Sequence, residues 1–123
     1  MRRRDEVAVI GEAIEAKAAG DGHRGIAARL GVPPWRVRRW LRRFLERAVA
    51  IREHFTRWAY ALDVSLGPLA AAGDAFGDAV AAIGVAARAA VLRLGPGPVW
   101  PWAAFASGGV LLCNTKCPLP PVL

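Results

Sequence analysis

The most informative part of this sequence is residues 23–43, which read HRGIAARLGVPPWRVRRWLRR. Ile26, Ala27 and Leu30 recur at helical spacing and predict a short helix over residues 23–30. Gly31 then predicts a sharp break, because glycine adopts the left-handed conformation that follows many helix ends. Pro34 suits the first position of the next helix, where its missing N–H leaves no hydrogen bond unmade.

A further helix is expected before this stretch, over residues 5–19. Its apolar residues also recur at helical spacing, and Gly20 ends it. Asp5 is a candidate cap for this helix, and Asp21 is a candidate cap for the helix over residues 23–30.

After the break, apolar residues recur every three or four positions as far as Leu62. No glycine or proline lies between Trp35 and Leu66, so a single helix of about 30 residues is allowed. Gly67-Pro68 signals a turn, and residues 69–94 form an alanine-rich helical segment that can fold back on the long helix. The stripe of this segment is Phe76, Val80, Ile83, Ala87, Val91 and Leu94.

Gly95-Pro96-Gly97-Pro98 closes the alanine-rich segment. The remaining residues are apolar but aperiodic, with one short helix near residues 103–106. The expected fold is therefore all-α, with three parts: a trihelical head over residues 1–47, a helical extension over 48–95, and an apolar tail over 96–123.

Residues 23–43 resemble the helix-turn-helix unit of bacterial regulators, resolvases and proteins associated with insertion-element transposases. In that pattern a small residue, Ala27, lets two helices cross closely, and Leu30 precedes the turn glycine. Val32 fills the core beside the turn, while Val37 and Trp40 face inward from the second helix. With the helix before it, the resemblance covers residues 5–45.

The resemblance implies that the second helix docks in the major groove of double-stranded DNA. Arginine suits this role because it binds guanine bidentately and also binds phosphate. Pro33, Pro34 and Trp35 stand where many members of the family carry a capping hydroxyl and polar reading residues, which leaves base specificity open. The residues expected to face DNA are Arg24, Arg29, Trp35, Arg36, Arg38, Arg39, Arg42 and Arg43.

Arg2, Arg3 and Arg4 resemble the basic arm that some homeodomain-like proteins lay in the minor groove. A frayed, solvated terminus is the alternative, because chain ends are commonly loose.

Charge is divided unevenly along the chain. Residues 1–60 hold 14 bases and 7 acids, whereas residues 61–123 hold 3 of each, so the whole net charge of +7 lies in the first half. This imbalance favours a polyanionic partner for the first half and another role for the second.

The sequence gives little support for an enzyme or a cofactor. Hydroxyl, thiol and imidazole groups are few. A transposase nuclease would need clustered carboxylates held on strands, and the sequence predicts no such strands. Cys113 and Cys117 are at most half of a zinc site, and reduced thiols are the simpler interpretation.

Membrane and leader segments are not expected. No apolar run reaches the roughly 20 residues that cross a bilayer, and acids interrupt the stretch after the first arginines. We expect a cytoplasmic DNA-binding protein, a transcriptional regulator or a transposition-associated factor. A homodimer through residues 48–95 is also expected, since the apolar stripe of the long helix exceeds what the head can cover. The alternative to the dimer is that the apolar tail, residues 99–123, covers this stripe within one chain. The alternative is a helical oligomerisation or interaction module that does not bind DNA.

Overall fold

The computed structural model is all-α, as the sequence predicts, and describes residues 2–69, 71, 73–107 and 119, with side chains from residue 7 onward. Within these residues no strand occurs. The six helices are α1 (Arg2–Ala18), α2 (His23–Leu30), α3 (Pro34–Glu46), α4 (Ala48–Leu62), α5 (Ala75–Leu94) and α6 (Val99–Ala106).

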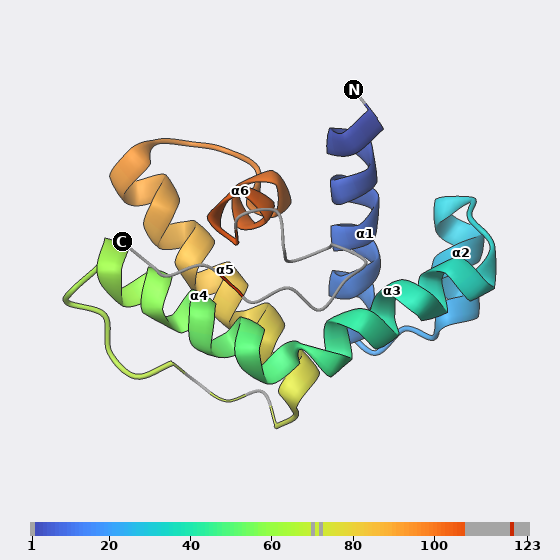
Figure 1. Ribbon diagram of the computed structural model, residues 1–123, viewed down its shortest axis with the longest axis horizontal. Coiled ribbons are helices and arrows are strands. Elements are labelled where there is room, and N and C mark those ends of the chain that lie inside the picture. Colours follow the sequence, from blue (N-terminus) through green and yellow to red (C-terminus); the bar gives the residue numbers. More distant parts are fainter. Residues whose placement is uncertain (1, 70, 72, 108–118, 120–123) are drawn as a thin grey trace.

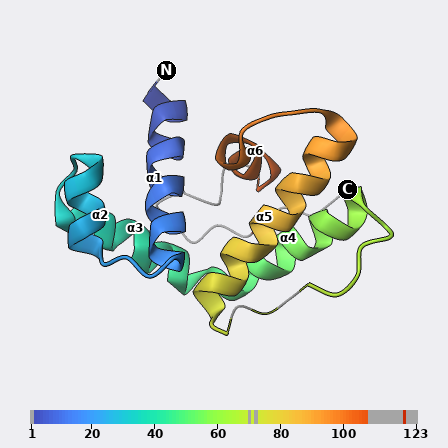
Figure 2. The same cartoon turned by 180° about the vertical axis from the view of Figure 1, so that it is seen from behind.

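The helices are arranged around one continuous core. Helices α1, α2 and α3 contact one another on one side of the molecule, and α4 packs most extensively on α5 on the other side (Figures 1 and 2). Helix α6 lies between α1 and α5 and contacts both. The buried cluster therefore extends from Ile10 in α1 to Ala106 in α6.

The expected single helix after Pro34 is wrong, because it breaks at Arg47 into α3 and α4. Arg47 has φ −110° and ψ 6°, and its N–H bonds the Phe44 carbonyl three residues back, at 3.1 Å. Helix α3 packs on α1 and α2, whereas α4 packs on α5. One straight helix could not turn its apolar face toward both sets of partners, and the bend lets it do so.

The alanine-rich segment does not fold back on the long helix, although the sequence predicts it to do so. The rings of Phe44, in the last turn of α3 just before α4, and Phe76, in the first turn of α5, lie 4.9 Å apart. At the other end, Arg93 Nη1 donates to the Leu62 carbonyl at 3.3 Å. The two helices therefore run in the same direction. The connection between them returns along α4, where the Tyr60 hydroxyl donates to the Gly67 carbonyl at 2.9 Å.

Helix α5 begins later than predicted, at Ala75 rather than residue 69. The Asp74 side chain caps it by accepting a hydrogen bond from the Gly77 N–H. Its buried face is made chiefly of alanines, which allow close approach of neighbouring helices. Phe76 and Ile83 are buried as predicted, but Val91 and Leu94, also placed in the stripe, are exposed.

The caps expected at the first two helices are wrong. Helix α1 begins at Arg2, so Asp5 lies inside it rather than at its start. The N-cap of α2 is Gly22, without a side-chain hydrogen bond. Asp21 instead forms an ion pair with Arg29, with an Oδ2–Nη1 distance of 3.5 Å.

Helix α6 extends the short helix expected near residues 103–106 back to Val99 and completes the core. The Trp100 indole lies against Gly11 of α1, where a Cβ atom would overlap the ring. Trp102 makes edge contacts with Phe55 and Trp58 of α4, with ring centroids 5.9 and 5.7 Å apart. Cys113 and Cys117 lie outside the described residues.

Helix α5 corrects the expectation that no segment is apolar and long enough to cross a bilayer. It has 20 residues, and its most apolar 18-residue window has a mean hydropathy of 1.6. Charged residues interrupt the apolar run at Asp78 and Arg88, but the mean hydropathy over the whole segment is still high enough for a spanning helix. Length and composition alone are weak grounds for a membrane role, because core helices of soluble proteins share them.

Candidate nucleic-acid interface

The turn between α2 and α3 is built as its residues predict. Gly31 is left-handed, with φ 69° and ψ 30°, and the Val32 N–H donates to the Ala27 carbonyl at 3.1 Å. Pro33 is extended and is the N-cap, so α3 starts at Pro34. The turn fixes where α3 leaves α2.

The inner face of α3 is the one predicted. Val37 and Leu41 are buried, and Trp40 is half-buried against the core. Ile26 and Ala27 of α2 are buried, while Leu30 and Val32 pack partly against the same cluster. With this face buried, the arginines between these positions on α3 face away from the core.

Most of the residues expected to face DNA are exposed on α2 and α3. These are Arg24, Arg29, Trp35, Arg36, Arg38, Arg39 and Arg42. The structure thus places them on the surface of two adjoining helices, which is what a contact with a large anionic partner requires.

Two members of the predicted set are less free than the sequence implies. Arg43 is half-buried and already has an interaction within the chain. Arg29 is paired with Asp21 across exposed surface, a contact that is weak in water and that a phosphate could displace. The side chains of Arg2, Arg3 and Arg4, which begin α1, lie outside the described residues.

Trp35 lies in the first turn of α3 with 59% of its surface exposed. The Arg36 guanidinium carbon lies 5.6 Å from the centre of the indole ring, a cation–π arrangement. The pair forms a flat, cationic surface at the N-terminal end of α3. Such a surface can contact a sugar-phosphate backbone or the edge of a base.

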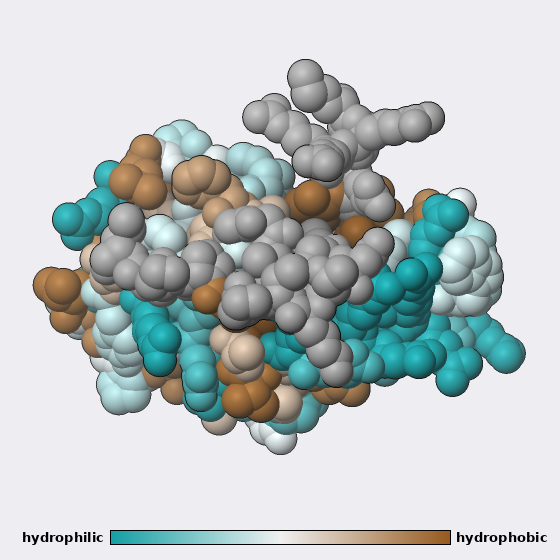
Figure 3. All heavy atoms as spheres, in the orientation of Figure 1, coloured by the Kyte–Doolittle hydropathy of each residue, from teal (hydrophilic) through white to brown (hydrophobic). Residues whose placement is uncertain are grey.

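Positive charge predominates around these residues. Between Asp21 and Glu46 the sequence contains seven arginines and no acid. Hydrophilic side chains gather over α2 and α3 in the space-filling view (Figure 3). Along α3 itself, the first acid in the sequence is its last residue, Glu46.

Sequence reasoning missed a second basic feature, on α4. Arg52 and Arg57 are exposed and line an open hollow of about 500 Å³ together with Thr56 and Tyr60. Glu53 lies in the same hollow and offsets part of its charge. The prediction for this helix used only its long apolar stripe, which is the buried face. The arginines on its other face were equally visible in the sequence.

Among the described residues no three His, Cys, Asp or Glu side chains group as metal ligands would. Burial lowers the pKa of the His54 imidazole, the hydrogen bond to the Ala106 carbonyl opposes this shift, and Arg57 adds to it. His54 is a residue of α4 and contacts α6. Its lowered pKa is therefore a property of the core and not of the candidate interface.

Comparisons with protein-family models, with characterised proteins and with solved structures found no match to this chain. The resemblance to helix-turn-helix proteins therefore depends on the residues of the α2–α3 unit themselves.

Proposed function

We propose that this protein binds double-stranded DNA with the exposed arginines of α2 and α3, and that α3 docks in the major groove. The observation that carries the proposal is the run of exposed arginines on α2 and α3, within a stretch without acids. A helix with a buried inner face and a cationic outer face matches the width and charge of the groove.

The biological role proposed with this activity is that of a transcriptional regulator or a transposition-associated factor in the cytoplasm. Phosphate contacts would supply most of the affinity, because α3 carries arginines but no Asn, Gln, Ser or Thr. The alternative is a helical oligomerisation or interaction module that does not bind DNA, in which the head is a scaffold and the long apolar stripes bind the partner. That module would show no salt-sensitive binding to random duplex DNA.

The test is a titration of random duplex DNA at several salt concentrations. Affinity should fall steeply with salt, by a log–log slope of about 0.9 per phosphate contacted. In the double variant Arg39→Gln/Arg42→Gln, loss of two contacts should lower the slope by about 1.8. Both side chains are exposed, so the helical circular dichroism should stay unchanged.

The matched control is Arg52→Gln/Arg57→Gln, which removes the same charge from exposed positions on α4. The control should keep most of the affinity and slope, because only long-range attraction is reduced. Equal losses in the two double variants would show that net charge, not the α3 surface, governs binding. Unchanged binding in the α3 variant would place the DNA surface elsewhere.

The homodimer through residues 48–95 stays a prediction, although the reason first given for it no longer holds. Ile51 and Phe55 of the stripe are fully buried within the chain, against α5 and α6. Pairing would need another apolar surface, and sedimentation at micromolar concentration decides between monomer and dimer.

A further inference from the structure

The open hollow that Arg52, Thr56, Arg57 and Tyr60 line on α4 has the size of a small-molecule site. Its volume is about 500 Å³, and ligand pockets have roughly 300–1,000 Å³. One wall is the outer face of α4, and the other is the connection that returns along this helix (Figure 1). We call this site the α4 hollow.

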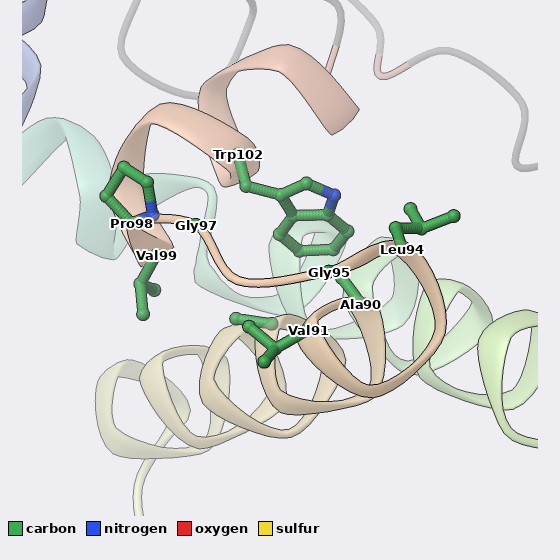
Figure 4. A pocket seen from close by; sticks show the side chains of 9 residues that line it. Ala90, Val91, Leu94, Gly95, Gly97, Pro98, Val99 and Trp102 are labelled. Atoms are coloured by element: carbon green, nitrogen blue, oxygen red, sulfur yellow. The ribbon is translucent and has the colours of Figure 1, made fainter.

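A second hollow, between the end of α5 and α6, lacks these properties. Its volume is about 50 Å³, and the side chains around it, such as Leu94, Val99 and Trp102, carry no charge (Figure 4). It is therefore too small for a metabolite and has no group that would bind an anion.

The wall that the connection forms in the α4 hollow is held at two points. The Tyr60 hydroxyl donates to the Gly67 carbonyl at 2.9 Å, which joins the connection to α4. Leu69 is half-buried and packs against the hydrophobic core. Both walls are thus fixed parts of the folded chain, and Pro68 and Leu69 give the hollow an apolar side.

The opposite wall carries polar groups in two lines along α4. Arg52, Thr56 and Tyr60 are four residues apart and therefore follow one line of the helix surface. Glu53 and Arg57 form the neighbouring line. Two cations, one carboxylate and two hydroxyls therefore line the same side of the hollow.

The charged groups of the α4 hollow are not paired with one another. Glu53 and Arg57 have the four-residue spacing, with the acid first, that favours an ion pair on a helix. Among the described residues neither of them forms an ion pair, and the same holds for Arg52. The half-buried Thr56 hydroxyl likewise has no hydrogen-bond partner in the described part of the chain. All four groups are therefore available to a ligand.

The mixture of charges indicates the class of this ligand. A polyanion such as duplex DNA would bring several phosphates past Glu53, which would repel them. A single phosphate group avoids that cost and matches Arg52 and Arg57, because guanidinium groups bind phosphate through paired N–H donors. Glu53 can accept hydrogen bonds from hydroxyl groups of the same molecule.

We propose that the α4 hollow binds a small sugar monophosphate, either free or within a mononucleotide. Arg52 and Arg57 bind the phosphate, and Glu53 accepts hydrogen bonds from the sugar hydroxyls. Pro68 and Leu69 contact the carbon skeleton. This site lies on a different helix from the arginines of the proposed DNA contact, so either activity can fail without the other.

The experiment is calorimetric titration of the full chain with ribose 5-phosphate, inorganic phosphate and ribose. Ribose 5-phosphate should bind more tightly than either of the others, because only it engages both the arginines and Glu53. Arg52→Gln/Arg57→Gln should weaken its binding by at least about tenfold. Glu53→Ala should reduce the preference for ribose 5-phosphate over inorganic phosphate by about fivefold. Circular dichroism should be unchanged, because all three side chains are exposed.

The matched control is Arg39→Gln/Arg42→Gln, which removes the same charge from exposed positions on α3. It should bind ribose 5-phosphate like the full chain. The proposal is overturned if the full chain does not bind ribose 5-phosphate, if it binds inorganic phosphate equally well, or if the control loses as much affinity as Arg52→Gln/Arg57→Gln. It is also overturned if duplex DNA displaces ribose 5-phosphate from the control as effectively as from the full chain, since the hollow would then belong to a DNA-binding surface. Absence of DNA binding would contradict the proposed function and leave these outcomes unaffected.

Discussion

At the scale of single residues, Gly31 sets the angle between α2 and α3. Its φ of 69° lies in the left-handed region, which β-branched residues strongly resist. No atom lies near the position that a Cβ would occupy, so strain and not crowding determines the effect. Gly31→Val should therefore lower the free energy of unfolding by more than about 1 kcal/mol in urea titrations.

Asparagine is the matched control at this position, because it tolerates the left-handed conformation better than other residues. Gly31→Asn should cost clearly less than Gly31→Val. Equal stability of the valine variant and the parent chain would show that the turn is not left-handed at residue 31.

The two informative glycines differ in how visible they are in the sequence. Gly31 follows a helix pattern and precedes two prolines, so local chain chemistry alone predicts its role, as it does for Pro34. Gly11 lies inside a helix, where the sequence indicates only a weak point. Its function is to make room for Trp100, a residue 89 positions away, and no local pattern contains that information.

At the scale of elements, the link between α4 and α6 should make stability depend on pH. His54 Nε2 lies 3.1 Å from the Ala106 carbonyl and 3.2 Å from Trp58 Nε1, in a buried position. Burial lowers the pKa of this imidazole below 6.5, so the unfolded chain binds its proton more readily than the folded chain. The contribution of neutral His54 to stability is fully present above 6.5 and is lost as the pH falls from there through the lowered pKa of the folded chain.

Urea unfolding between pH 8 and pH 5 measures this dependence. In the variant His54→Phe, which keeps an aromatic ring at the site, the curve of stability against pH should be flatter over this range. His23→Phe is the matched control and should retain the slope of the parent chain. A parent chain whose stability is constant between pH 8 and pH 5 would contradict the role assigned to His54.

The helices show which parts of the fold can be predicted from the periodicity of apolar residues. The bounds of α2 and the start of α3 follow from local signals, and the all-α class follows from the 3.6-residue pattern. The break at Arg47 cannot be predicted from local signals, since neither glycine nor proline marks it. Only the different packing partners of α3 and α4 require it. The shared direction of α4 and α5 is likewise invisible, because Gly67-Pro68 predicts a turn but not the path of the residues that follow.

The candidate site is predicted better than the packing around it. Residues between the buried positions of an amphipathic helix must face outward, so the exposure of Arg38, Arg39 and Arg42 follows from the pattern once Val37 and Leu41 are assigned to the core. The partners of Arg29 and Arg43 could not be predicted in this way. Each depends on where a neighbouring side chain comes to lie after folding.

At the scale of the whole molecule, the net charge lies in the first half of the chain, whereas the hydrophobic core extends through both halves. Trp100 of α6 packs on Gly11 of α1, and Trp102 of the same helix packs on Phe55 and Trp58 of α4. One short helix therefore ties residues before position 47 to residues after it. We expect the chain to unfold in one transition, with circular dichroism and tryptophan fluorescence changing at the same urea concentration.

Trp100→Ala tests this connection most directly. Removing the buried indole should lower the free energy of unfolding by about 3–5 kcal/mol and shift the curves of both probes together. Trp100→Phe should cost much less, about 1 kcal/mol, since a ring still fills the space beside Gly11. The indole N–H of Trp100 has no hydrogen-bond partner among the described residues, so the phenylalanine variant loses area rather than a bond. If Trp100→Ala instead separated the two probes into distinct transitions, α1 to α3 would unfold independently, and the boundary near residue 47 would divide two folding units.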